Sequence, residues 1–363
     1  MATKKKVLSL ILFAMVAFAC QAEIKVEVSE TVELMGVLSR TAGFDEYCQD
    51  VAGQYSKDTE MWFASYRQHP TVVYYQELRN KYGIGYDRVT NMGVHLEISK
   101  GKVKLAGDRE ELDNGWQNVN LDEFVDRLNK FYKETRFHDF YEQHRAFYDE
   151  GLKDFETNVM PVFHQDWYSR FYGNEASEQF HVLIGFTLGR NNNGARRQLE
   201  GKPKDVFAVM GYNINPQMGR PSWDASILIH EFNHSFVNPL LDIPANAAKM
   251  EKVGAKLFLF SKFLMERQAY NTWQIVINES IVRAAVYIYM RDYGLINKGT
   301  LNFLFDEVWN NGFQWVPELV ESLRYYASHR EEYKTLNDYY PEIVSCLSKY
   351  ITDEALRLQK VLK

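Results

Sequence analysis

Residues 227–236 contain one charged side chain, Glu231, which lies between two histidines, His230 and His234. The remaining positions are apolar or uncharged, whereas a helix exposed to solvent is usually charged on its outer face. We therefore predict a helix that is buried inside the protein. A chain of 363 residues is long enough to build a core around such a helix.

The order His-Glu-x-x-His suggests what this helix does chemically. Residues four apart lie on one face of a helix, so His230 and His234 can bind one Zn²⁺ together. Glu231 lies about 100° further round the helix, from where its carboxylate can reach a water molecule beside the metal. The alternative is a buried helix whose histidines only form hydrogen bonds.

Such a site needs a third protein ligand, and three of the glutamates downstream of the histidines are candidates. Glu251 and Glu266 lie among charged residues, as is typical of solvent-facing positions. Glu279 lies in the largely apolar run 273–287, where an unpaired carboxylate would be costly to bury. We therefore predict Glu279 as the ligand. An ion pair with Arg283, four residues on, is the alternative, and the two interpretations are compatible.

These motifs resemble the zincin metallopeptidases, and among them the thermolysin-like gluzincins, whose third ligand is often a Glu after Asn, as in Asn278-Glu279. The metzincin branch does not fit, because Val237 and Leu240 stand where it has Gly and a third His. The resemblance implies one zinc ion per chain, Glu231 as general base, and three metal ligands: His230, His234 and Glu279.

Two features depart from the gluzincin pattern. The separation between His234 and Glu279 is longer than in thermolysin, and Arg283 stands where thermolysin-type enzymes have an Asp. The whole chain is also similar to an uncharacterised family of secreted bacterial proteins. Four downstream residues are candidates for stabilising the oxyanion of a hydrolytic reaction, namely Tyr287, Tyr325, Tyr326 and His329.

The hydrophobic pattern predicts an α+β fold dominated by helices. Asn120 followed by Glu123 indicates a helix start. Residues 180–187 and 206–212 have the composition of strands in a small mixed sheet, and 189–194 form a turn in the polar connection between them. The second strand is either an exposed edge, to which a peptide could add, or an interior strand.

We expect three parts along the chain: a signal peptide over residues 1–22, an α-rich region over 23–175, and a zincin-like catalytic core over 176–363. Within the core, we expect Ser222 to cap the helix that carries the histidines and Pro239 to end it.

The N-terminus has the three-part pattern of a secretory signal peptide, with three lysines, an apolar run over 7–18 and then small residues. Cleavage after Ala19 or after Ala22 both leave a small residue at the cut. We expect a periplasmic or extracellular protein, with a lipid anchor on Cys20 as the alternative.

Two cysteines remain after this segment, Cys48 and Cys346. An oxidising compartment permits a disulfide between them, and two buried free thiols are the equal alternative.

The net charge of −6 excludes a general nucleic-acid binder, and no apolar run is long enough to span a membrane. We predict a secreted zinc metallopeptidase acting on peptide or protein substrates. The alternative is a secreted peptide- or glycan-binding protein on a zincin-derived, inactive scaffold, since aromatic residues make up 15% of the chain. The oligomeric state is left open.

Overall fold

The computed structural model describes residues 24–173 and 178–361. Its main sheet has the strand order β1-β4-β6-β5, with bounds Lys25–Glu27, Gln179–Gly185, Asp205–Gly211 and Asn193–Arg197. The strands β1, β4 and β6 run parallel, and β5 pairs with β6 in the antiparallel direction. Every residue of β6 is buried, as expected for a strand with neighbours on both sides. The sheet thus combines β1, near the N-terminus, with strands that follow residue 178.

This sheet decides between the two alternatives for residues 206–212 and corrects the prediction for residues 189–194. Residues 206–212 do not form the edge, because β6 lies between β4 and β5. Residues 193 and 194, which we assigned to a turn, begin the edge strand β5. The run Asn191-Asn-Asn-Gly194 has turn-like composition, but pairing with β6 satisfies the main chain of its last two residues and makes them a strand.

Two hairpins complete the strands. They pair β2 (Leu96–Ser99) with β3 (Lys102–Leu105), and β7 (Ile214–Asn215) with β8 (Arg220–Pro221).

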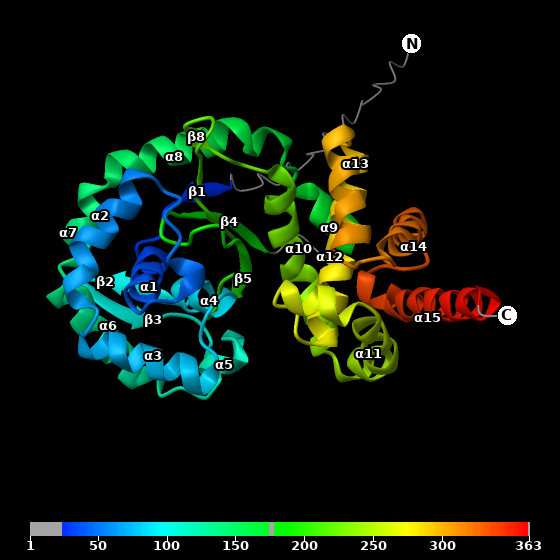
Figure 1. The fold of residues 1–363 in the computed structure, drawn as a ribbon, viewed down its shortest axis with the longest axis horizontal. Helices are drawn as coiled ribbons and strands as arrows, with labels where there is room; N and C mark the ends of the chain where they lie inside the picture. The colour runs from blue at the N-terminus through cyan, green and yellow to red at the C-terminus, as the bar shows by residue number, and fades with distance from the viewer. Residues whose placement is uncertain (1–23, 174–177, 362–363) are drawn as a thin grey trace, which may run out of the picture.

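Helices dominate the first half of the described chain, and in Figure 1 α2, α3, α6 and α7 form an arc around α1, on the opposite side of the main sheet from α10. The predicted helix start at Asn120 is confirmed: its side chain accepts a hydrogen bond from the amide of Glu123 at 3.2 Å. The bounds are α1 Glu30–Thr41, α2 Gln54–Phe63, α3 Pro70–Tyr82, α4 Asp87–Val94, α5 Asn114–Gln117, α6 Leu121–Glu134, α7 Phe137–Gln143, α8 Arg145–Asn158 and α9 Asp166–Tyr172.

The second half is helical after β8. Helix α10 packs on β5 and β6 on one side and on α12 on the other, so it is covered from two directions (Figure 1). The bounds are α10 Ala225–Asp242, α11 Pro244–Arg267, α12 Trp273–Asp292, α13 Lys298–Phe305, a π-helical turn η5 Asp306–Asn310, α14 Val316–Ser328 and α15 Leu336–Val361. The predicted helix-dominant α+β class is confirmed.

Both predicted ends of α10 are wrong. The cap is Asp224 rather than Ser222, and its carboxylate accepts from the amide of Ser226 at 2.8 Å. Pro239 lies inside the helix, which continues to Asp242. A proline removes only one hydrogen-bond donor, and burial of Leu240 in the core helps offset that loss.

Cys48 and Cys346 are free thiols, which excludes the disulfide, and Cys48 is exposed rather than buried. Sγ of Cys48 lies 3.5 Å from the main-chain oxygen of Arg40, and Sγ of Cys346 lies 3.5 Å from the main-chain oxygen of Glu318. The signal peptide, its cleavage sites and Cys20 lie outside the described residues. Across the described ranges, no helix combines the length and the apolar character that crossing a bilayer requires.

Candidate metal centre

Helix α10 presents His230 and His234 on one face, one turn apart. The two imidazole rings are nearly perpendicular, at 80°, with their centroids 4.7 Å apart. Their Nε2 atoms are 3.0 Å from each other. The two rings therefore direct one nitrogen each toward a common point, as the spacing in the sequence predicts.

Helix α12 brings Glu279 to the same point. Its two carboxylate oxygens lie 3.5 Å from Nε2 of His230 and 3.4 Å from Nε2 of His234. Tetrahedral zinc with bonds of about 2.0–2.1 Å separates its ligand atoms by roughly 3.3 Å. The three measured separations lie close to that value, so these side chains fit a zinc ion. Among the described residues, they form the cluster of histidine, cysteine and acidic side chains that could hold a metal.

The protonation states also suit a cation. Burial lowers the pKa of His230 to about 3, which leaves its imidazole neutral at physiological pH. Burial alone would raise the pKa of Glu279, but the positive charge of Arg283, with a smaller effect of the two histidines, brings it down to about 2. A neutral imidazole and an ionised carboxylate are the forms that bind metals.

Asn238 orients His234 from one turn further along α10. Its Oδ1 lies 3.1 Å from Nδ1 of His234. If Nδ1 donates its proton there, Nε2 of His234 carries a free lone pair toward His230 and Glu279. Asn238 was not among the predicted site residues, although it stands four residues after His234 and so lies on the same face of the helix.

Glu231 is buried beside the ligands, and burial raises its pKa to about 7. The histidine His234 and the main-chain amide of Gly194 in β5 oppose this increase, and the charge of Glu279 adds to it. A carboxyl group whose pKa is near neutrality can both accept and return a proton, as a general base must.

Arg283 supports the carboxylate of Glu279 by forming an ion pair with it. The guanidinium donates to the carboxylates of Glu279 and of Glu307, so the predicted ion pair is present while the carboxylate of Glu279 also faces the two histidines. It also donates to the hydroxyl of Tyr270 at 3.3 Å. Sequence reasoning missed Glu307 and Tyr270, because neither has a helical spacing to Glu279 or Arg283 that would mark the contact.

The four oxyanion candidates have other contacts. The hydroxyls of Tyr287 and Tyr326 donate to the main-chain carbonyls of Thr300 and Phe171, at 3.2 and 2.7 Å. Tyr325 and His329 stack on each other with ring centroids 3.7 Å apart, and Tyr325 is exposed.

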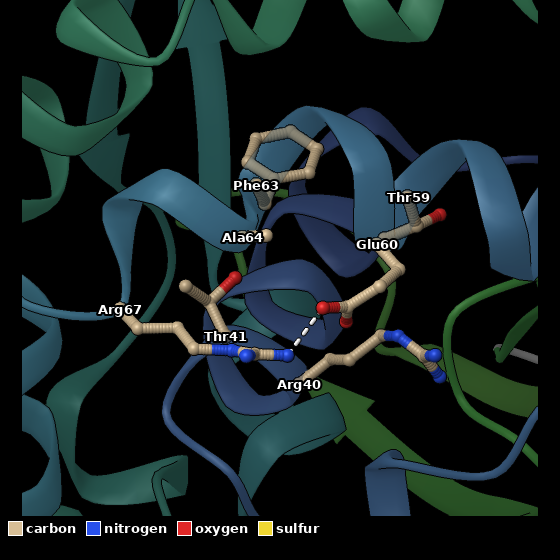
Figure 2. Close-up of a pocket in the computed structure, with 7 residues that line it drawn as sticks. All are labelled: Arg40, Thr41, Thr59, Glu60, Phe63, Ala64 and Arg67. Atoms are coloured by element: carbon tan, nitrogen blue, oxygen red, sulfur yellow. Dashed lines mark hydrogen bonds and ion pairs between the residues drawn. The ribbon is translucent and has the colours of Figure 1, made fainter.

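A separate small hollow lies between α1 and α2 (Figure 2). Arg67 and Glu60 form an ion pair across it, and Arg40 pairs with Asp50 nearby. Its volume of about 10 Å³ has room for about one water molecule, so it is not a substrate site.

Residues 24–346 match the family described as a domain of unknown function, DUF4932, and the chain belongs to that family. No curated protein and no solved structure matches the chain. This family assignment says what the chain is related to and does not assign an activity.

Proposed function

We propose that this protein is an exported zinc metallopeptidase in which His230, His234 and Glu279 hold the metal and Glu231 is the general base. The observation that carries the proposal is the convergence of three ligand atoms from α10 and α12 at separations close to those of tetrahedral zinc. The resemblance to gluzincins rests on the same residues. The pattern of residues 1–22 supports export.

Two imidazoles and one carboxylate leave a fourth position open, as in catalytic zinc sites. When bound, zinc would supply a Lewis acid that polarises a carbonyl and lowers the pKa of a water to about 7. Glu231 would accept the proton of the attacking water and deliver it to the leaving amine. Its pKa of about 7 suits both transfers.

The edge strand β5 offers a place for a peptide. It pairs with β6 on one side, and no further strand of the described residues pairs with it on the other. Gly194 of β5 lies directly against the turn of α10 that carries Glu231 and His234. A substrate added to β5 as a further strand would therefore pass close to the proposed metal site.

The test is to compare the chain lacking residues 1–22 with its Glu231→Gln variant. Wild type should contain about one zinc per chain and cleave members of an unbiased peptide library, with products identified by mass spectrometry. Glu231→Gln should retain the zinc and lose at least about 100-fold in cleavage rate, the lower range for loss of a general base.

Glu266→Gln, on the exposed side of α11, is the matched control and should behave as wild type. Absence of zinc from the wild-type protein would defeat the proposal. Zinc without cleavage would instead favour the peptide- or glycan-binding alternative.

A further inference from the structure

Arg283 links the proposed ligand Glu279 to a second buried carboxylate, Glu307. Nη1 of Arg283 donates to Oε2 of Glu279, and Nε donates to Oε2 of Glu307. Arg283, Glu279 and Glu307 are 9%, 8% and 5% exposed, so water screens their charges little. Breaking up such a buried group leaves a charge without its partner.

The contacts around Arg283 hold its guanidinium in one orientation. Nη2 donates to the hydroxyl of Tyr270 at 3.3 Å, and the ring of Phe313 lies 4.2 Å from the guanidinium carbon. The other oxygen of Glu307 accepts from Nδ2 of Asn311 at 2.9 Å. Each part of the guanidinium therefore has a defined neighbour. Because the guanidinium is fixed, its hydrogen bond also fixes the carboxylate of Glu279.

Glu307 contacts Arg283 from the π-helical turn η5. The amide of Asn311 bonds to the carbonyl of Asp306 at 2.9 Å, the wider spacing that defines this turn. Within η5, Glu307 and Val308 are buried while Asp306 and Trp309 are exposed. Single π-helical turns are rare and occur frequently at functional sites.

The charges have a consequence for a cation at the proposed site. Arg283 alone would neutralise Glu279 and place a positive charge beside a bound dication. With both carboxylates ionised, the group Glu279, Arg283 and Glu307 keeps a net negative charge. Glu307 thus cancels the charge of Arg283 while leaving its hydrogen bond to Glu279 in place.

We propose that Glu307 is a positioning residue for the metal centre: it holds and neutralises Arg283, and Arg283 in turn aims the carboxylate of Glu279 at the two histidines. The inference rests on the proposed function, since it concerns the affinity of the same site for zinc. It adds a residue that does not touch the metal and that lies outside the motif-bearing helices α10 and α12.

The experiment measures the zinc dissociation constant of the metal-stripped chain by competition with a chromophoric chelator. Glu307→Gln keeps the shape of the side chain and removes its charge, and should weaken zinc binding about 10- to 100-fold, the range for residues that support metal ligands. The d–d spectrum of the Co²⁺-loaded variant should also shift, because Glu279 is no longer held in one position. If Glu307 had a purely structural role, Glu307→Gln would lower the melting temperature and leave the zinc dissociation constant and the Co²⁺ spectrum unchanged.

Asp306→Asn is the matched control, because it removes one negative charge from the same turn at an exposed side chain bonded only to Asn310 among the described residues. It should bind zinc within about twofold of wild type. If Glu307→Gln does not fold, Asn311→Ala, which removes only the support of Glu307, should weaken binding by a smaller factor of the same sign.

Three outcomes would overturn the inference. Wild-type affinity in a folded Glu307→Gln, or in Asn311→Ala where Glu307→Gln does not fold, would show that Glu307 is not needed. Equal losses in Asp306→Asn and Glu307→Gln would show that overall charge, and not position, is responsible. A wild-type chain that binds no zinc would defeat the proposed function and this inference together.

Discussion

Two buried glutamates show that neighbouring residues decide what a buried carboxyl group does. Glu279 has Arg283 and two histidines beside it, and its pKa falls to about 2. Glu33 in α1 is also buried, but its hydrogen-bond donors are neutral: the hydroxyl of Tyr55 at 2.7 Å and the amide of Phe186 at 2.5 Å. Burial therefore prevails at Glu33 and raises its pKa to about 7.

The raised pKa of Glu33 predicts a pH-dependent stability. The folded protein holds a proton on this group more tightly than the unfolded chain, whose pKa is near 4.5. The contribution to stability is complete below pH 4.5 and is lost as the pH rises through about 7. A shift of this size corresponds to a loss on the order of 3 kcal/mol.

Urea unfolding of wild type and Glu33→Gln between pH 4.5 and 8 checks this. The stability of wild type relative to the variant should fall as the pH rises, because glutamine does not titrate. A constant difference across that range would show that Glu33 does not change protonation on unfolding.

At the scale of elements, the contact between β5 and α10 depends on a glycine. A Cβ added to Gly194 would lie 2.3 Å from the main-chain oxygen of Glu231 and 3.0 Å from Cβ of His234. Only glycine allows the strand to approach the helix this closely. The approach places the edge of the sheet beside the histidines and supplies an amide that influences the pKa of Glu231.

Gly194→Ala should therefore force β5 away from α10. We expect a loss of about 1–3 kcal/mol in the free energy of unfolding, typical of overpacking, together with weaker zinc binding. Asn193→Ala in the same strand is the control, since its Nδ2 is buried without a hydrogen-bond partner among the described residues. Unchanged stability and zinc affinity in Gly194→Ala would contradict the close contact.

At the scale of the whole molecule, the proposed metal centre joins helices that are distant in the chain. His230 and His234 come from α10, Glu279 comes from α12, and Arg283 extends the connection to η5. A ligand that binds only the folded state stabilises it by mass action, by about 4 kcal/mol at a thousandfold excess over the dissociation constant. A bound metal should therefore strengthen the assembly of these helices.

Removal of metal with a chelator should lower the melting temperature of wild type by several degrees, and added zinc should restore it. Glu279→Ala should abolish the response, because the site loses its acidic ligand. Glu251→Ala on α11 should retain it, since that residue is exposed. A larger effect of Glu251→Ala than of Glu279→Ala would show that the ligand assignment is wrong.

Contacts within one helix could be predicted from the sequence. The helical repeat alone places His230 and His234 on one face, and Glu279 in reach of Arg283, since each pair is four residues apart. The apolar surroundings of both segments indicate burial without knowledge of the fold. The same local rule applies to Asn120, whose spacing to Glu123 predicted the start of α6.

Contacts between elements had no comparable signal. That β5 forms the edge of the sheet, that Gly194 touches α10, and that Glu307 meets Arg283 depend on pairing and packing between segments far apart in sequence. The continuation of α10 past Pro239 also follows from packing rather than from local preference. Local periodicity determines which side chains share a face of a helix, whereas the free energy of packing the whole chain determines which faces meet.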